Sequence, residues 1–393
     1  MLNESRYACV LGTPLRLHKN HKALLKPELR RRGRTMSWSY SKAGVDLDRV
    51  KRAHKSIKEI IEVTYNFRRG LFGRVISGAG HYAALIDIGG GKVLALHADG
   101  VGTKVLIAQL MNRYDTIGID CVAMNVNDLV CVGAEPVAMV DYIAMERSDE
   151  DMVAEIMRGL VRGAEMAGIA IVGGETAVMP GVIKGVVEGK GFDLAGLSVG
   201  VVDVDKIIMG DKVQLGDVVV GVRSSGIHSN GLTLARKVLL EYAGFTVHSY
   251  VDELHCTIGE ELLKPTLIYV KPVLEMLQKG VEIHGIAHIT GGSFTKLLRI
   301  APKGLGFRLD NMPQPQAVFN LIQRLGKISS WEMYRTFNMG VGFCVVVPRD
   351  VVEEVIKTFK VHGYEAQQIG FVIDRPQVEI ELKVDRLVYQ KLD

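Results

Sequence analysis

The sequence predicts an α/β protein with two domains, each built on a mixed sheet. At 393 residues the chain is too long for one compact core of ordinary size. Its apolar segments alternate between helical and strand spacing along the whole length. Hydrophobic residues make up 48% of the chain and charged residues 23%, a balance typical of soluble globular proteins. We expect domains at residues 36–205 and 206–393.

The first half contains the elements that position the most distinctive motifs. Apolar residues at helical spacing predict a helix over 46–66. The run Gly89-Gly90-Gly91 predicts the tight turn of a hairpin between two strands. The remaining predictions, in chain order, are the hairpin strands at 81–88 and 92–98, a helix at 116–132, a strand at 137–143, a helix at 149–167, and strands at 169–172 and 194–202.

The second half contains two strand-loop-helix units. A strand at 217–222 leads into a loop over 224–231 and then a helix that begins near Leu232. A strand at 284–289 leads into Thr290-Gly291-Gly292-Ser293 ahead of another helix. Exposed amides at helix starts attract phosphate, so both loops are candidate phosphate or ribose sites. A helix at 351–359 and a strand at 364–372 follow later in the chain.

Residues 1–35 differ in charge from the rest of the chain. They contain nine Lys or Arg residues and two Glu residues, whereas the remainder contains 39 basic and 42 acidic residues. This basic leader fits a basic arm, an organelle-targeting peptide, or translated sequence upstream of a start at Met36. Its brevity and low Ser content favour the third interpretation. Because the remainder is nearly neutral, we expect no nucleic-acid partner.

Cysteine usage and the length of apolar runs indicate where the protein resides. The five cysteines are odd in number and widely scattered, so their spacing predicts neither a disulfide framework nor a zinc site. No apolar stretch reaches the ~20 residues of a membrane span. We therefore expect a cytoplasmic protein with no membrane partner.

The run Asp99-Gly100-Val101-Gly102-Thr103-Lys104 directly follows an apolar strand. Its glycines let backbone amides approach an anion, Lys104 supplies a positive charge, and Asp99 offers a hard oxygen for Mg²⁺. The run therefore indicates a site for metal-bound phosphate. A hairpin turn with a solvated Lys104 explains the same residues about equally well.

Two further carboxylates lie at the ends of apolar elements. Asp128 lies next to Asn127 late in a predicted helix, and Glu175 follows Gly173-Gly174. A single carboxylate of this kind usually caps a helix or a turn. Together with Asp99, the two resemble a site that neutralises polyphosphate with one or two Mg²⁺ ions. The chain has neither a P-loop motif nor a dinucleotide fingerprint, so those two classes of nucleotide site are excluded.

Two histidines lie in Gly-rich segments at strand ends. His228 falls in the loop over 224–231, and His288 shortly precedes Gly291-Gly292. Each fits a hydrogen-bonded structural role and a role in acid-base catalysis near a reacting carbonyl equally well. The polar run at 332–338 includes Arg335. Its residues fit a functional segment and a solvated turn equally well.

Taken in order, these motifs resemble the aminoimidazole ribonucleotide synthetase family, also called the phosphoribosylformylglycinamidine cyclo-ligases. Each run alone is a weak signal, but the ordered set is specific and extends from residue 39 to residue 342, with similarity continuing toward the C-terminus. The matching runs are Ser39 to Asp46, Asp99 to Lys104, Asp115 to Asp120, Val126 to Leu129, Gly133 to Pro136, Gly173 to Ala177, Ser224 to Gly231, Ala287 to Gly292 and Met333 to Gly342.

The resemblance implies a fold and a reaction. It implies an N-terminal domain whose sheet forms a barrel with that of a second copy in a homodimer, and a C-terminal α/β sandwich. It also implies cyclisation of formylglycinamidine ribonucleotide to 5-aminoimidazole ribonucleotide in purine biosynthesis. ATP would phosphorylate the formyl oxygen, and attack by the ring nitrogen would then expel phosphate. The implied cofactors are ATP and Mg²⁺, with a monovalent cation as an optional third.

The resemblance also implies roles for individual residues. The implied catalytic residues are Lys104, His228 and His288, and the implied metal ligands are Asp99, Asp128 and Glu175. The implied ATP-binding residues are Lys58, Gly78, Gly80, Asp99, Gly100, Gly102, Thr103, Asn127, Asp128, Gly173 and Gly174. The implied substrate-binding residues are Ser224, Ser225, Ser229, Asn230, Thr290, Gly291, Gly292 and Arg335.

The chain departs from the family pattern at a few positions. Val178 stands where the family usually has a glutamate, so any role of that carboxylate is absent or supplied elsewhere. Ser293 and Ile227 replace a common glycine and a common proline. Thiamine-phosphate kinase and selenophosphate synthetase are disfavoured, because the early loop lacks their Gly-Asp-Asp and reactive cysteine. A non-catalytic nucleotide-binding scaffold is disfavoured because all three carboxylates are present.

Overall fold

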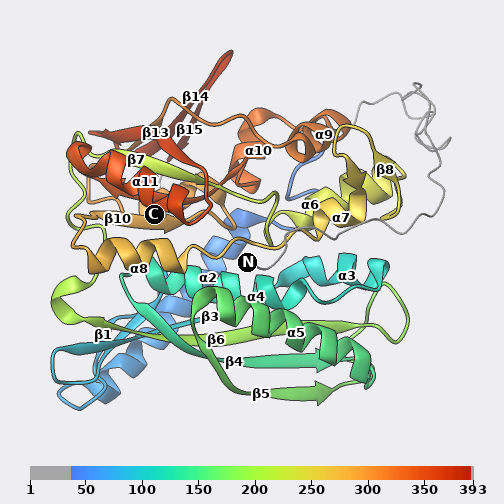
Figure 1. The fold of residues 1–393 in the computed structure, drawn as a ribbon, viewed down its shortest axis with the longest axis horizontal. Helices are drawn as coiled ribbons and strands as arrows, with labels where there is room; N and C mark the ends of the chain where they lie inside the picture. The colour runs from blue at the N-terminus through green and yellow to red at the C-terminus, as the bar shows by residue number, and fades with distance from the viewer. Residues whose placement is uncertain (1–36, 391–393) are drawn as a thin grey trace, which may run out of the picture.

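The computed structural model describes residues 37–390, so the expectations about the basic leader lie outside the described residues. Two domains, each with its own large sheet, lie one above the other in Figure 1. Helices α4 (Ile117–Val130) and α8 (Val270–Gln278) lie between them. The predicted α/β class with two mixed sheets is confirmed. Among the helices of the described residues, none combines the length and apolar character needed to cross a membrane.

The first sheet has six strands in the order β1-β2-β3-β6-β4-β5. The β4–β5 pair is parallel, and the other neighbouring pairs are antiparallel. The predicted hairpin is β2–β3, and all three residues of Gly89-Gly90-Gly91 have the positive φ that glycine adopts without strain. The strands are β1 (Val75–Ser77), β2 (Ala84–Asp87), β3 (Lys92–Gly100), β4 (Glu135–Met145), β5 (Ala170–Val178) and β6 (Phe192–Asp203).

Helix α4 packs on one face of this sheet, and α5 packs beside it (Figure 1). Glycines allow the two helices to approach closely. A Cβ on Gly118 would lie 2.1 Å from the backbone nitrogen of Leu160, and one on Gly159 would lie 2.4 Å from the carbonyl oxygen of Asp115. The other helical segments of this half are α2 (Leu47–Ile61), η2 (Glu62–Arg68), η3 (Gly102–Lys104), α3 (Val105–Met111), α5 (Glu150–Ala167) and η4 (Val204–Lys206).

The second sheet has seven strands in the order β10-β12-β7-β13-β11-β14-β15, with β11 and β14 parallel. Its strands are β7 (Val218–Arg223), β10 (Gly285–His288), β11 (Gly306–Leu309), β12 (Val341–Val347), β13 (Ala366–Ile373), β14 (Gln377–Leu382) and β15 (Asp385–Gln390). A short pair, β8 (Tyr250–Val251) and β9 (Cys256–Thr257), lies apart from it. The helical segments are α6 (Leu232–Arg236), η5 (Lys237–Tyr242), α7 (Ile258–Leu262), α8, η6 (Ser293–Arg299), α9 (Ala317–Gly326), α10 (Ser330–Thr336), η7 (Arg349–Val351) and α11 (Val352–Val361).

The structure differs from the sequence prediction at Gly173-Gly174-Glu175-Thr176. The sequence suggested that the strand ends before this run, but β5 continues through it to Val178, paired with β4. Gly174 is required by packing, because a Cβ at this position would lie 2.4 Å from Oδ1 of Asp141. These two glycines therefore belong to a strand and not to a loop.

The first described residues are attached to the second domain. The backbone N–H of Trp38 donates to the carbonyl oxygen of Gly326 at 3.0 Å, and that of Tyr40 donates to Oε1 of Glu332 at 2.6 Å. Helix α2 then leads back toward the first sheet. Residues 37–45, which we expected with the first domain, thus tie the two domains together.

Candidate active site between the two domains

Helix α4 presents a row of side chains to the second domain. Asp120, Met124 and Asp128 are spaced four residues apart and Asn127 follows Met124 by three, so all four lie toward one face of the helix. Every residue of α4 is buried, and buried polar groups require hydrogen-bond partners. The partners of these side chains come largely from the second domain, so this face of α4 joins the two domains.

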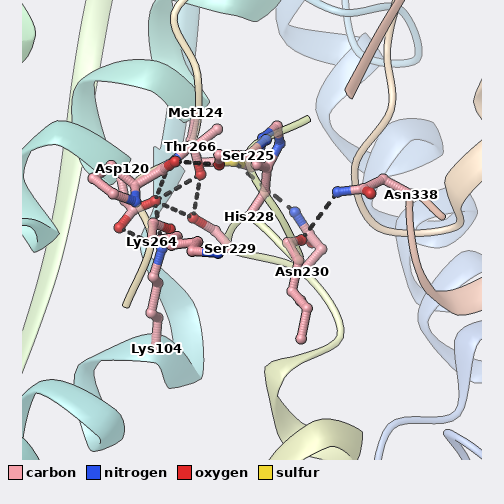
Figure 2. Close-up of polar contacts among 12 residues, drawn as sticks. Lys104, Asp120, Met124, Ser225, His228, Ser229, Asn230, Lys264, Thr266 and Asn338 are labelled. Carbon is pink, nitrogen blue, oxygen red and sulfur yellow. Dashed lines mark hydrogen bonds and ion pairs between the residues drawn. The ribbon is translucent and has the colours of Figure 1, made fainter. Parts of the chain in front are cut away.

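Asp120 and Lys104 form a buried ion pair at one end of this row (Figure 2). Oδ1 of Asp120 accepts from the N–H of Thr266 at 2.7 Å, from its hydroxyl at 2.6 Å and from Oγ of Ser229 at 3.3 Å. The ammonium of Lys104 lies 2.9 Å and 2.8 Å from the two Asp120 oxygens and donates to the carbonyl oxygen of Lys264 at 2.5 Å. Burial lowers the pKa of Lys104 below its usual value, although the charge and hydrogen bond of Asp120 act to raise it. Lys104 therefore bridges the domains.

Asp128 meets His288 across the domain boundary. Nδ1 of His288 lies 2.6 Å from Oδ1 of Asp128, and Nε2 of His97 lies 3.5 Å from Oδ2. Oδ1 of Asn127 accepts from the N–H of Tyr269 at 2.9 Å, so its Nδ2 faces Nε2 of His288 at 3.5 Å as a donor. Nδ1 of His288 therefore carries the proton that Asp128 accepts. Burial raises the pKa of Asp128, but this hydrogen bond and the histidine charges together leave it below its usual value.

Asp99 lies at the end of β3, within electrostatic range of Asp128. Asn125 holds its backbone, because the amide accepts from the N–H of Asp99 and donates to its carbonyl oxygen, both at 3.1 Å. The N–H of Gly100 donates to Oδ1 of Asp99 at 2.7 Å. Burial raises the pKa of Asp99, and the charge of Asp128 raises it further, although His97 opposes both. Two carboxylates that repel in this way create the electrostatic setting for a divalent cation.

Glu175 does not join this pair within one chain. Across the sheet, Asp99 pairs with Gly196, Gly196 with Asp141, and Asp141 with Gly174. Three strand spacings of about 4.8 Å therefore put the Glu175 strand about 14 Å from that of Asp99. Glu175 also follows Gly174, so its side chain points to the opposite face from Asp99. In the described part of one chain, no cluster of three or more His, Cys, Asp or Glu side chains could hold a metal ion.

The rest of the run over 99–104 adjoins the second domain. Gly102 has φ of +68° and begins η3, and Oγ1 of Thr103 lies 3.0 Å from Oγ1 of Thr233 on α6. Lys104 has no exposed surface. The alternative that this run is a hairpin turn with a solvated lysine is therefore wrong.

The two Gly-rich loops of the second domain meet each other. A Cβ on Gly291 would lie 3.0 Å from Oδ1 of Asn230. Around them, His228, Ser293 and Met339 have left-handed φ values of +64°, +48° and +46°. Such conformations cost about 1–3 kcal/mol each and persist where the surrounding structure enforces them, often at functional sites.

His228 presents an unused donor. Its Nε2 accepts from the N–H of Ser225 at 3.2 Å, so Nδ1 carries the ring proton. Nδ1 is buried and has no hydrogen-bond partner among the described residues. Burial lowers the pKa of His228 well below its usual value, and the charges of His288 and Lys104 lower it further. The ring is therefore neutral and offers a buried N–H to a ligand.

The other predicted substrate-binding side chains are mostly engaged in the same loops. Oγ of Ser224 donates to Oδ1 of Asn338 at 3.0 Å, and Oγ of Ser225 donates to the carbonyl oxygen of Pro265 at 2.5 Å. These bonds hold the loop in its strained shape. The two loops approach each other at Asn230 and Gly291. The first loop holds Ser224, Ser225, Ser229 and Asn230, and the second holds Thr290, Gly291 and Gly292.

Three predicted residues lie outside this arrangement. Lys58 forms an ion pair with Glu62 at 3.6 Å on the surface of α2 and lies near Gly80, where a Cβ would be 3.6 Å from its Nζ. Gly78 packs against a ring of η2, because a Cβ there would lie 2.2 Å from the hydroxyl of Tyr65. None of the three hydrogen-bonds to the Asp99–Asp128 pair.

Arg335 also lies apart from the two carboxylates. It forms an ion pair with Asp48 and stacks on Trp331, with its guanidinium carbon 4.9 Å from the ring centroid. Two open pockets of about 380 and 310 Å³ lie on the second domain around Arg223 and Tyr364. Ser224 lines the smaller one. Neither pocket is lined by the paired carboxylates.

Sequence reasoning missed two ionisable side chains of this region. Asp120 precedes Asp128 by eight residues, so helical spacing could have placed both on one face. His97 precedes Asp99 by two residues on a strand, so alternation could have placed both on one side of the sheet.

The chain matches known proteins over nearly its whole described length. Residues 80–202 match the family described as AIR synthase related protein, N-terminal domain, and residues 214–383 match the corresponding C-terminal domain. A phosphoribosylformylglycinamidine cyclo-ligase of Methanothermobacter thermautotrophicus is 47% identical over 344 residues, covering 87% of this chain and 97% of the relative. One of Pyrococcus furiosus is 49% identical over 343 residues, covering 87% and 97%.

The chain belongs to the phosphoribosylformylglycinamidine cyclo-ligase family. Solved structures support the fold. The HypE-HypF complex matches with TM-score 0.59 at 20% identity over 84% of this chain and 99% of that one. Thermotoga maritima PurL complexed with ADP matches with TM-score 0.53 at 16% identity over 80% of this chain and 45% of that one.

One departure from the cyclo-ligase pattern has a visible structural consequence. Ser293 stands where the resemblance led us to expect glycine, and its φ of +48° is one that glycine adopts without strain. Oγ of Ser293 donates to the carbonyl oxygen of Phe337 at 2.6 Å. This hydrogen bond offsets part of the strain that the serine introduces.

We predict that Lys104→Met destabilises the protein by about 3–5 kcal/mol, because it leaves Asp120 buried without its counter-charge. Urea unfolding measures this loss. Lys92→Met, which breaks the exposed pair with Asp203 seen at 2.5 Å, should change stability little. The double variant Lys104→Met/Asp120→Asn should lose less than Lys104→Met alone. An equal loss in the double variant would contradict the account of this pair.

Proposed function

We propose that the protein catalyses the ATP-dependent cyclisation of formylglycinamidine ribonucleotide to 5-aminoimidazole ribonucleotide, with release of ADP and phosphate, in purine biosynthesis. The observation that carries this proposal is the identity of 47–49% to cyclo-ligases over 97% of their length. The paired carboxylates and the buried histidine donor between the domains support it, because phosphoryl transfer and ring closure need these groups.

We assign the binding of Mg²⁺ and of the ATP phosphates to Asp99 and Asp128. Mg²⁺ in phosphoryl-transfer sites is commonly held by one or two carboxylates together with phosphate oxygens and water, so the pair fits this ion. When bound, the ion would neutralise the negative charge of the transferred phosphoryl group. We assign the other ATP contacts to the residues expected from the sequence, with Lys58 approaching the nucleotide from α2 and Gly78 and Gly80 from the loop between β1 and β2.

On the substrate side, we assign to His228 the binding of the reacting amide. The bond between the γ-phosphorus of ATP and its bridging oxygen breaks, ADP leaves with the electron pair, and the phosphoryl group bonds to the formyl oxygen. A nitrogen of the substrate then attacks the formyl carbon and gives up a proton, and the carbon-oxygen bond breaks to release phosphate. The Nδ1–H of His228 can hydrogen-bond the oxygen that gains charge in these steps. His288 holds Asp128 in place, and the two Gly-rich loops bind the ribonucleotide.

We further propose that the protein is a homodimer that packs through the open face of its first sheet. Val140, Tyr142 and Leu197 lie on the face opposite α4 and are 38%, 42% and 40% exposed. Contiguous apolar surface of this kind marks interaction sites. Glu175 pairs with Tyr142 and so lies on the same face. We therefore assign its carboxylate to the subunit interface, where it can reach the site of the partner subunit.

We assign the reaction to the cytoplasm. The described cysteines, Cys121, Cys131, Cys256 and Cys344, are free thiols, as a reducing compartment favours. The small-molecule substrate needs no membrane or nucleic-acid partner. We assign no ligands to a monovalent cation.

Incubating the purified protein with formylglycinamidine ribonucleotide and Mg-ATP should yield the aminoimidazole ribonucleotide and one ADP per product. Asp99→Asn and Asp128→Asn should each lower turnover by about 100-fold or more, because each removes charge that stabilises the transferred phosphoryl group. Asp310→Asn, a change at an exposed carboxylate of the second domain, serves as the control. Failure of the unmodified protein to form product would refute the proposed function.

Leu197→Glu should convert the dimer to a monomer, because it places a charge in the apolar face. Size-exclusion chromatography with light scattering measures the mass. Val361→Glu, at a 73% exposed valine on the second domain, should leave the dimer intact. A monomeric unmodified protein, or a dimer that survives Leu197→Glu, would rule out this interface.

A further inference from the structure

The linking segment, residues 37–48, holds helix α10 of the second domain by two bonds. Oε1 of Glu332 accepts from the backbone N–H of Tyr40 at 2.6 Å. Three residues later on the same helix, the guanidinium of Arg335 forms an ion pair with Asp48 in the first turn of α2. Residues three apart are neighbours on one face of a helix, so both bonds hold the same face of α10.

The residues that directly follow α10 contact both Gly-rich loops. Phe337 and Asn338 are buried. In the first loop, the carbonyl oxygens of Gly226 and Ile227 accept from Nδ2 of Asn338 at 2.9 Å and 3.2 Å. In the second loop, Oγ of Ser293 donates to the carbonyl oxygen of Phe337 at 2.6 Å. The position of α10 therefore sets the position of both loops at once.

The contacts of Arg335 differ from those of a substrate ligand. Its guanidinium lies over the ring of Trp331, 4.9 Å from the ring centroid, while it pairs with Asp48. Among the described residues, its hydrogen bond goes to the linking segment and to neither Gly-rich loop. The substrate contact that the sequence resemblance implied would require the guanidinium to leave both partners.

We propose that Glu332 and Arg335 are positioning residues that hold both Gly-rich loops in the shape that binds the ribonucleotide. This inference deepens the proposed function and rests on it. The two side chains tie α10 to the linking segment, and Phe337 and Asn338 carry that restraint to the loops. Without the tie, the loops sample other arrangements, and the apparent affinity for the substrate falls with the fraction of molecules that stays competent to bind. Because the linking segment continues into α2, the same tie joins the substrate loops to the helix that carries Lys58.

Glu332→Ala should raise the KM for formylglycinamidine ribonucleotide by roughly 10-fold while kcat and the KM for ATP stay within about twofold, because bound substrate restores the loop shape. Glu332→Gln keeps an oxygen that accepts from the N–H of Tyr40, so it should recover most of the affinity. Glu353→Ala, at an exposed glutamate of α11, is the matched control and should match the unmodified enzyme. A merely structural role of Glu332 would lower stability to urea and leave this KM unchanged.

A change at Asp48 distinguishes positioning by Arg335 from direct contact with the substrate. The side chain of Asp48 is 47% exposed and lies on α2, outside the second domain. Asp48→Asn and Arg335→Met should each raise the KM for the ribonucleotide, and the double variant should raise it no further, because both changes break one ion pair. If Arg335 contacts the substrate, Arg335→Met alone raises this KM and Asp48→Asn leaves it unchanged, which overturns the assignment of Arg335.

A binding measurement separates this proposal from the proposed function. Titration calorimetry with formylglycinamidine ribonucleotide measures affinity without turnover. The unmodified protein should bind the ribonucleotide roughly 10-fold more tightly than the Glu332→Ala variant does. If Glu332→Ala fails to fold, Asp48→Asn carries the same test from the exposed end of the linking segment.

Each outcome of these experiments decides the role of the linking segment. Folded variants that match the unmodified protein in affinity and KM overturn the positioning role. An unmodified protein that binds the ribonucleotide more tightly than the variants, yet forms no product, would refute the proposed reaction and leave the positioning role standing. An unmodified protein that does not bind the ribonucleotide would refute both.

Discussion

The need to satisfy polar groups on a fully buried helix governs the arrangement of this protein. Helix α4 carries Asp120, Asn127 and Asp128 on one face, and each finds its partners in the second domain. A buried charge without a partner would cost several kcal/mol, so the domains have little freedom to separate. Domain docking and site assembly are thus the same event: the bonds that satisfy α4 also bring the second domain's loops to the end of β3.

Local strain in the second domain is a consequence of the same arrangement. The non-glycine residues His228, Ser293 and Met339 adopt left-handed backbone conformations where the loops meet. The buried amide of Asn338 stabilises this region, because it donates to the carbonyl oxygens of Gly226 and Ile227 at 2.9 Å and 3.2 Å. Asn338 lies just before β12, a fully buried strand of the second sheet. The result is a neutral histidine with one ring nitrogen hydrogen-bonded and the other left for a ligand.

Much of the fold could be predicted from local sequence. The triple-glycine link, the helical spacing over 149–167 and the alternation of strands and helices each produced a correct element, because turn chemistry and periodicity act over a few residues. The end of β5 could not be predicted this way. Gly173 and Gly174, which would normally break a strand, remain in it through pairing with β4. Gly174 is required there because the side chain of Asp141 on the neighbouring strand leaves no room for a Cβ.

The candidate site was predictable only where it depends on strand and helix ends. Asp99 and Asp128 were found because each lies at such an end, and the structure places them in one electrostatic unit. Pairing across the sheet and between domains decides the rest. It puts Glu175 on the opposite face of the sheet and gives Lys104 a buried partner.

The most direct test is a crystal structure with Mg²⁺ and the β,γ-imido analogue of ATP. The account predicts that the phosphates and Mg²⁺ lie against the carboxylates of Asp99 and Asp128, while the Lys104–Asp120 ion pair stays closed. A triphosphate bound elsewhere, for instance in the open pockets around Arg223 and Tyr364, would contradict it. So would a structure in which Lys104 has left Asp120 to contact the γ-phosphate.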